Sequence, residues 1–444
     1  MIQVQSNGGT VSAATHSSHL EARVVPLLVV GLYVSTIAIP RIIGAGGAVR
    51  TKLVLEALLF GAALGGIGLV LFCRGRVQFD RTYQGIAAVF GATVLLSTVA
   101  LVVGLLRGYP TGDVFGDYYK FIIPAATVTL VYAVADSSEQ LETALAVAFR
   151  IGLLLIASVL TLYVTGVLGL NDRPRFIYQF PILIVLGYWQ YRQGDPVARY
   201  GFPFLVVATL PLVGYSQSLS LLLQTLLTAV LAVTYARFNS PRELAVGGGV
   251  VAVVGVIGGG LLLLAATQLS SAQWREYGYL GSKMVALVGD YTLYERLIVL
   301  GGSRAAEPFG VLARIDGGLL ELLVGSGMGS TFMVSSPFGS PRWIGEDHFV
   351  HAGLWEAVLR TGLLGGLAYL GVVVSYIYVG WKVSGDSYLG ALAAANASTT
   401  LLFAPLVGKL LGPQFFSYAL FAYALVRWGE LRDCSEKLAT TSDT

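Results

Sequence analysis

EDHFVHAGLWE, residues 346–356, is the stretch at which a long polar segment of the chain ends and an apolar span begins. It holds Asp347, an acid that can orient a base, and two histidines, His348 and His351. If the stretch is helical, Asp347 and His351 lie four residues apart and share a face. A histidine at the edge of an apolar span can change its charge near neutral pH. The stretch therefore predicts a site of proton transfer.

The composition is that of a membrane protein. Of the 444 residues, 55% are hydrophobic and only 12% are charged, and the mean hydropathy is +0.73. Apolar runs of about 17–25 residues, the length that crosses a bilayer as a helix, recur throughout. A transmembrane β-barrel would show short alternating segments instead. The predicted fold class is an all-α, polytopic integral membrane protein.

The apolar runs define about twelve predicted transmembrane helices. Their approximate limits are 24–40, 53–73, 84–106, 119–135, 144–166, 177–191, 201–215, 219–236, 245–268, 352–380, 389–408 and 411–427. The glycines, 55 in all, suit close packing of helices in lipid.

Lysine and arginine are more frequent in the loops on one side of these spans, which places both termini in the cytoplasm under the positive-inside rule. The first residues lack the features of a cleavable signal peptide. The chain then divides into a cytoplasmic tail at 1–23, helices one to nine at 24–268, a large extracytoplasmic loop at 269–350, helices ten to twelve at 351–427, and a cytoplasmic tail at 428–444.

The charge pattern also bounds the partners. The net charge of +3 is spread over many loops and forms no dense basic block, so nucleic acid is not an expected partner. The two cysteines, Cys73 and Cys434, both fall on the predicted cytoplasmic side, where disulfides are rare.

The large loop carries two local features. Phe309 to Val324 is semi-apolar and predicts a helix at the membrane surface. Gly325, Gly327 and Gly329 then predict a tight turn. Without a following Lys-Ser or Lys-Thr pair, this glycine pattern does not predict a nucleotide site.

Residues 325–366 resemble the signature region of the O-antigen ligase and O-antigen polymerase family of membrane glycosyltransferases. In that family a Gly-x-Gly-x-Gly-like turn precedes an outer loop that ends in a histidine, and two glycines follow eleven and fourteen residues later. Here the turn is residues 325–329, the histidine is His351, and the glycines are Gly362 and Gly365. About twelve spans with a long outer loop before the tenth also resemble this family.

Two positions depart from the family's pattern. Ala352 follows the histidine where family members often have asparagine. Gln217 stands near the start of the eighth span, in the place of a functional arginine. A glutamine is therefore the candidate phosphate contact at that position.

The resemblance implies a C-type glycosyltransferase-like architecture in the cell membrane, with its active site on the extracytoplasmic face. The donor would be a glycan linked to a polyprenyl phosphate or pyrophosphate, and the acceptor another glycan or a lipid. The reaction would be a metal-independent, inverting displacement without a cofactor. Whether the enzyme is a polymerase or a ligase stays open.

In this interpretation His351 is the general base that takes the proton from the acceptor hydroxyl. Asp347, or alternatively Glu346, would orient the imidazole, and His348 is the second candidate for the base. The alternative for His351 is an ordinary histidine at the membrane edge, with its ring in water.

The leaving phosphate needs positive charge, and a guanidinium matches phosphate oxygens in a bidentate geometry. Arg173 and Arg175 share one predicted outer loop, and Arg304 precedes the glycine turn. The alternative is that all three are solvated surface charges. No acidic pair lies beside these arginines, and Asp113 and Asp117 in another outer loop make only a poor cation site.

Two further arginines lie within predicted spans, where an unpaired charge is costly. Glu356 precedes Arg360 by four residues, which predicts an ion pair within one helix. Arg150 is predicted to extend from its span to water.

A transporter or lipid-glycan flippase is the alternative function. Transporters bind at the bilayer midplane between repeats and broken helices. This sequence shows no internal repeat, and its polar residues gather outside the spans. A purely structural membrane protein is the third option, and it leaves the loop at 269–350 unexplained.

Overall fold

The computed structural model describes residues 81–168, 179–216, 219–238, 303–334, 345–347, 353–404 and 415–442, with a few further positions between 26 and 72 and at 240–243. In chain order the elements are α4 (Arg81–Leu106), α5 (Thr111–Val134), α6 (Ser138–Val164), α7 (Phe180–Arg192), α8 (Ala198–Ser216), α9 (Leu219–Arg237), α14 (Ser303–Ile315), α15 (Leu319–Val324), β1 (Phe332–Val334), β2 (Gly345–Asp347), α16 (Gly353–Ser384), α17 (Tyr388–Phe403) and α18 (Phe415–Ser442). The predicted helical fold class is confirmed for these residues, apart from one short two-stranded sheet.

Three of the described helices are long and apolar enough to cross a membrane. They cover Tyr83–Leu106, Ser138–Val164 and Gly353–Ser384. Among the described residues, Leu221–Arg237 and Tyr388–Phe403 are apolar but shorter. The three long helices indicate a membrane protein. A total of twelve spans stays a prediction, and the predicted spans at 24–40, 53–73 and 245–268 fall largely outside the described residues.

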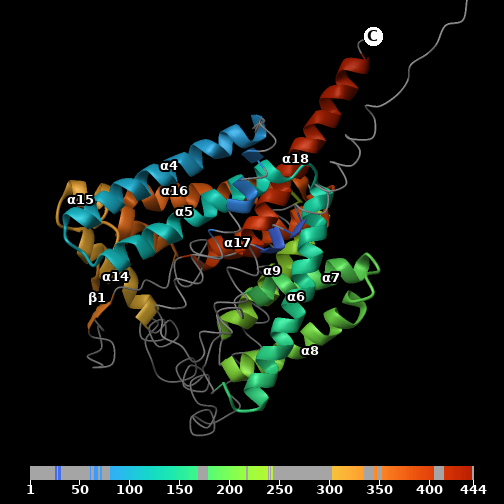
Figure 1. Cartoon of the computed structure of the whole chain (residues 1–444), viewed down its shortest axis with the longest axis horizontal. Helices are drawn as coiled ribbons and strands as arrows, with labels where there is room; N and C mark the ends of the chain where they lie inside the picture. The colour runs from blue at the N-terminus through green and yellow to red at the C-terminus, as the bar shows by residue number, and fades with distance from the viewer. Residues whose placement is uncertain are drawn as a thin grey trace, which may run out of the picture.

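Helix α17 lies at the centre of the bundle, against α16, α9 and α18. Residues 389–399 of this helix are all buried, and many of them are alanines. Small side chains let neighbouring backbones approach closely, which is how helices pack in lipid. Helices α4, α5 and α16 lie side by side on one flank of α17, and helices α6 to α9 form a second group (Figure 1).

Helix α5 begins eight residues before the predicted limit of its span. Asp113 and Asp117 were predicted to lie in a loop, and the structure places both in the helix. The prediction was wrong because it began the span with the apolar run at 119, whereas the helix also includes the polar residues before that run. Asp117 is only 1% exposed, because its carboxylate is paired inside the bundle.

Arg150 lies near the middle of α6, and its guanidinium Nη2 lies 2.7 Å from Asp195 Oδ2 in the turn before α8. Its side chain is half-exposed, so it reaches the edge of the bundle as predicted, but it does so with a partner.

Helices α14 and α15 and strand β1 gather at one end of α4, α5 and α16 (Figure 1). The predicted surface helix over Phe309–Val324 is in fact two helices, separated at residues 316–318. Strand β1 pairs antiparallel with β2, and Phe332 is the partner of Asp347.

This end of the molecule has its own small apolar core. Its buried members come from α14, β1 and the first turns of α16, and they are Val311, Ile315, Phe332, Val358 and Leu359. The core holds the first turns of α16 and strand β1, with which β2 pairs. The end of β2 and the start of α16 are the two flanks of residues 348–352. Those five residues lie outside the described part of the chain.

Candidate functional site

Residues 325–330, which we call the glycine segment, pass between α4, α5 and α16. Gly325, Gly327 and Gly329 have φ angles of 83°, 88° and 78°. This left-handed region is open to glycine and strained for other residues. The tight turn predicted from the glycine pattern is confirmed.

Each glycine of the segment also makes a close approach that a side chain would block. A Cβ on Gly325 would collide with the backbone of α16 at residues 360–362, and one on Gly327 would meet the backbone of Gly104 in α4. A Cβ on Gly329 would meet Val114 in α5. The glycines therefore set how close the three helices come to the segment.

Helix α16 has a kink at Gly362, where φ is 69° and ψ is −170°. A kink of this kind interrupts the helical hydrogen bonds and leaves carbonyls for other donors. The carbonyl of Leu359 accepts from the Ser326 amide at 2.9 Å, and that of Arg360 accepts from the Gly327 amide at 3.2 Å. The amides of the glycine segment thus satisfy backbone carbonyls that the kink in α16 leaves without a helical partner.

A buried ion pair holds α5 to α16 beside this kink. Arg360 is fully buried, and its Nε lies 2.8 Å from Asp117 Oδ2. The Arg360 guanidinium also donates to the hydroxyl of Ser330 at 2.8 Å and to the Ser330 carbonyl. The Gly329 amide donates to Asp117 Oδ2 at 3.0 Å. The pair thus ties the glycine segment to both helices.

A second pair lies next to the first. The Lys120 ammonium donates to Asp117 Oδ1 at 2.9 Å and to Glu356 Oε1 at 3.1 Å. Asp117, Lys120, Glu356 and Arg360 form what we call the buried ion network, which is neutral when all four are charged. Neutrality is what makes such burial tolerable, because an uncompensated charge inside the protein costs several kcal/mol.

The predicted partner of Arg360 therefore needs correction. The sequence predicted a pair with Glu356 within one helix, but the ion pair of Arg360 is with Asp117 of α5. Glu356 instead pairs with Lys120, also of α5. Helical spacing alone could not reveal partners on a different helix.

An exposed cluster lies at the end of α4. Arg107 Nη1 donates to Glu321 Oε1 at 2.6 Å, and Arg314 Nη1 lies 3.7 Å from the same oxygen. Arg314 also donates to the Tyr109 hydroxyl at 2.9 Å and to the Thr331 carbonyl at 3.2 Å. We call Arg107 and Arg314 the arginine pair. Each is 37% exposed, so the guanidinium groups are within reach of a ligand.

The hydrogen bond from Arg107 lowers the pKa of Glu321. A carboxylate whose pKa is lower in the folded state stabilises the fold at pH values above its unfolded-state pKa. This stabilisation is lost as the pH falls through the folded-state pKa. Glu321 is therefore ionised at neutral pH, and the cluster carries one negative and two positive charges.

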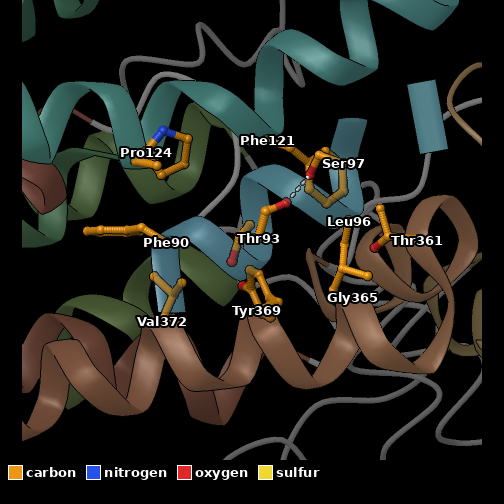
Figure 2. Close-up of a pocket in the computed structure, with 11 residues that line it drawn as sticks. Phe90, Thr93, Leu96, Ser97, Phe121, Pro124, Thr361, Gly365, Tyr369 and Val372 are labelled. Carbon is orange, nitrogen blue, oxygen red and sulfur yellow. Dashed lines mark hydrogen bonds between the residues drawn. The ribbon is translucent and has the colours of Figure 1, made fainter. Parts of the chain in front are cut away.

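A small cavity of about 20 Å³ lies between α4, α5 and α16. Figure 2 shows the side chains that line it, among them the hydroxyl-bearing Thr93, Ser97 and Thr361. These three hydroxyls donate to carbonyls of their own helices. The volume has room for about one water molecule, so the cavity is too small for a glycan.

Most of the predicted site residues lie outside the part of the chain that the structure describes. His348, His351, Arg173, Arg175 and Gln217 all lie outside the described residues. Asp347 ends strand β2, so the shared helical face predicted for Asp347 and His351 does not exist at that position.

Arg304 lies in the first turn of α14 and Glu346 lies in β2, but the placement of their side chains is not described.

Several charged residues of this end were missed or misread in the sequence. Lys120 lies within a predicted span, and a charge there is itself a signal of a buried partner. Arg107 gave no such signal, because it follows the end of an apolar run, where solvated charges are common, and Glu321 lies within LLELLV, a segment that the sequence predicted as a surface helix. Within the described residues, no group of three or more His, Cys, Asp or Glu side chains could hold a metal ion.

The arrangement has two distinct chemical capacities. The buried ion network has two acids and two bases on two helices, so it fixes how α5 and α16 lie against each other. The arginine pair is exposed and positive, so it can bind an anion at the end of a membrane helix. No family model matches the chain, and no curated protein is significantly similar to it.

Proposed function

We propose that the protein transfers a glycan from a polyprenyl phosphate or pyrophosphate carrier to a glycan or lipid acceptor on the outer face of the cell membrane. This is the chemistry of the O-antigen polymerases and ligases that residues 325–366 resemble. The observation that carries the proposal is the convergence, at one end of α4, α5 and α16, of the glycine segment, the arginine pair and both flanks of the histidine residues.

The chemistry requires positive charge where a lipid phosphate can reach it. Arg107 follows an apolar membrane helix directly, so its guanidinium lies at the level expected for a lipid headgroup. Arginine forms charge-assisted, bidentate bonds to phosphate oxygens. The arginine pair, and the predicted Arg173, Arg175 and Arg304, would neutralise the leaving phosphate.

The proposed reaction is a direct displacement. The acceptor hydroxyl oxygen attacks the anomeric carbon, the bond from that carbon to the phosphate oxygen breaks, and the electron pair stays on the phosphate. The hydroxyl proton passes to His351, or to His348 as the second candidate. Asp347 ends strand β2, which pairs with β1, and Phe332 of β1 packs in the small core with α14 and α16, which supports the role of Asp347 as the residue that positions the base.

Deletion of the gene, followed by sizing of surface glycans, tests this function. Glycans of a single repeat would identify a polymerase, because transfer to the acceptor continues without chain growth. Long glycans that remain on the carrier lipid would identify a ligase. Surface glycans of unchanged length and amount would contradict the proposal.

A flippase for lipid-linked glycans is the second candidate. It is favoured by the buried ion network, because charged groups within membrane helices often mark transport pathways. The same deletion strain separates the two functions. Loss of a flippase would leave lipid-linked glycans in the inner leaflet, where an impermeant sugar-oxidising reagent cannot label them. Loss of the transferase would leave them accessible outside.

Arg173→Ala and Arg175→Ala should each weaken use of the lipid-linked donor by about tenfold or more, since one charge-assisted phosphate contact contributes about 1.5–3 kcal/mol. Lysine at either position should rescue only partly, because it cannot form the bidentate fork. The measurement is the initial rate of transfer against donor concentration. Arg199→Ala, at the exposed start of α8, is the matched control. Wild-type rates in both Ala variants would exclude these residues from the phosphate site.

A further inference from the structure

The Glu321 carboxylate occupies a position that suits an anionic ligand. One of its oxygens, Oε1, accepts from Arg107 at 2.6 Å and from the Ser326 hydroxyl at 3.4 Å, and it lies 3.7 Å from Arg314. Two cations and a hydroxyl from three separate parts of the chain thus converge on one oxygen. The same donors suit a phosphate oxygen.

The donors keep other partners, so they would stay in place without Glu321. Arg314 is bonded to the Tyr109 hydroxyl and to the Thr331 carbonyl. Arg107 also donates to the carbonyl of Ser326 at 3.4 Å. A site that persists when its occupant leaves is preorganised for a second anion.

Glu321 is held mainly by these charges. Its helix, α15, has six residues, and none of them is fully buried, although Leu322 packs against the small core of this end. Gly318 and Gly325 flank the helix with φ angles of 151° and 83°. The second carboxylate oxygen lies over Gly317, where a Cβ would collide with it. Glu321 itself is not a member of that core, so its side chain could leave the arginine pair by rotating while α15 stays in place.

The surroundings indicate that the second anion is a lipid. Leu106 precedes Arg107 and is 83% exposed, and Leu319 and Leu320 precede Glu321 and are 73% and 77% exposed. Large apolar side chains exposed beside paired arginines match a molecule with an apolar chain and a phosphate head. A small soluble anion has no apolar part that could contact these leucines.

We propose that Glu321 acts as an internal substitute for phosphate in a site formed by Arg107 and Arg314, and that the phosphate of a polyprenyl-linked substrate displaces it. The identity of this lipid rests on the proposed function, whereas the site itself does not. The Glu321 carboxylate competes with other anions for Arg107 and Arg314, so weakly binding anions are excluded and the lipid phosphate binds.

The test is calorimetric binding of farnesyl phosphate, a short isoprenyl phosphate, to the purified full-length protein in neutral detergent. Glu321→Gln removes the competing charge and keeps the side-chain shape, so its affinity should be about tenfold higher than that of the wild type. Farnesol should not bind measurably to either protein. The increase in affinity caused by Glu321→Gln should be smaller for inorganic pyrophosphate than for farnesyl phosphate.

Further variants make the result specific. Arg107→Gln or Arg314→Gln, each combined with Glu321→Gln, should abolish the gain in affinity. Asp386→Asn, which removes a carboxylate paired with Arg427 elsewhere in the molecule, is the matched control and should bind like the wild type. All variants must unfold within a few degrees of the wild type for the comparison to hold.

Unchanged or weaker binding by a folded Glu321→Gln protein would overturn the proposal. A gain of equal size with pyrophosphate would overturn the assignment of a lipid ligand. The assay needs no glycan transfer, so it separates this proposal from the proposed function. Tighter binding in a protein that transfers no glycan would support the site and contradict the transferase.

Discussion

His351→Ala should slow glycan transfer by roughly 10²–10⁴-fold, the usual contribution of a general base. The loss should fall on turnover, because the donor is held by arginines and apolar surface and not by the imidazole. The variant should therefore express, insert and bind the lipid-linked donor like the wild type. The measurement is transfer in vitro, with purified protein and a lipid-linked oligosaccharide.

The histidine prediction has a matched control and a second readout. His348→Ala should retain more activity than His351→Ala, since His351 is the first candidate for the base. A general base works only when deprotonated, so wild-type activity should rise as the pH passes through the range where histidine titrates. That rise should be absent in the His351→Ala protein. Transfer within a few-fold of the wild-type rate by His351→Ala would exclude the general-base role.

Asp117→Leu should destabilise the protein by about 3–5 kcal/mol, because it removes one carboxylate from the buried ion network and leaves the four positions with one positive charge in excess. Arg360→Met should cost a similar amount, since it leaves Asp117 with one cation fewer. The double variant should recover much of the loss, because a pair of apolar side chains tolerates burial better than one isolated charge. The measurement is chemical unfolding of the purified protein in mixed micelles.

The exposed ion pair of Arg150 and Asp195 provides the comparison for this experiment. Arg150→Met should cost less than about 1 kcal/mol, because exposed pairs are screened by solvent. If Asp117→Leu lowers the free energy of unfolding no more than Arg150→Met does, the buried ion pair contributes no more stability than an exposed one, which would contradict this prediction.

The buried ion network matters for the site because it carries the glycine segment. Arg360 bonds to Ser330 and Asp117 bonds to the Gly329 amide. Strand β1 follows two residues later and holds β2, which ends at Asp347. Loss of Arg360 should therefore loosen the flank of the histidine residues as well as the bundle.

The positions of several apolar helices could be predicted from the sequence, because a helix expected to cross a bilayer is read directly from a long apolar run. The limits of α4, α7 and α9 agree with the predicted spans to within three residues. The tight turn at residues 325–329 could be predicted as well, because glycine alone adopts positive φ without strain. Both features depend on properties of residues that lie next to each other in the chain.

The partners of the charged residues were decided only by the tertiary structure. Arg107 meets Glu321 across 214 positions of sequence, and Lys120 meets Glu356 across 236. Arg360 shares a helix with Glu356, the partner that its spacing favours, yet it pairs with Asp117 of another helix. An ion pair forms where packing brings two charges within a few ångströms, and that distance is set by the kink at Gly362 and by the glycine contacts of residues 325–329. Neither is encoded by the residues of the pair themselves.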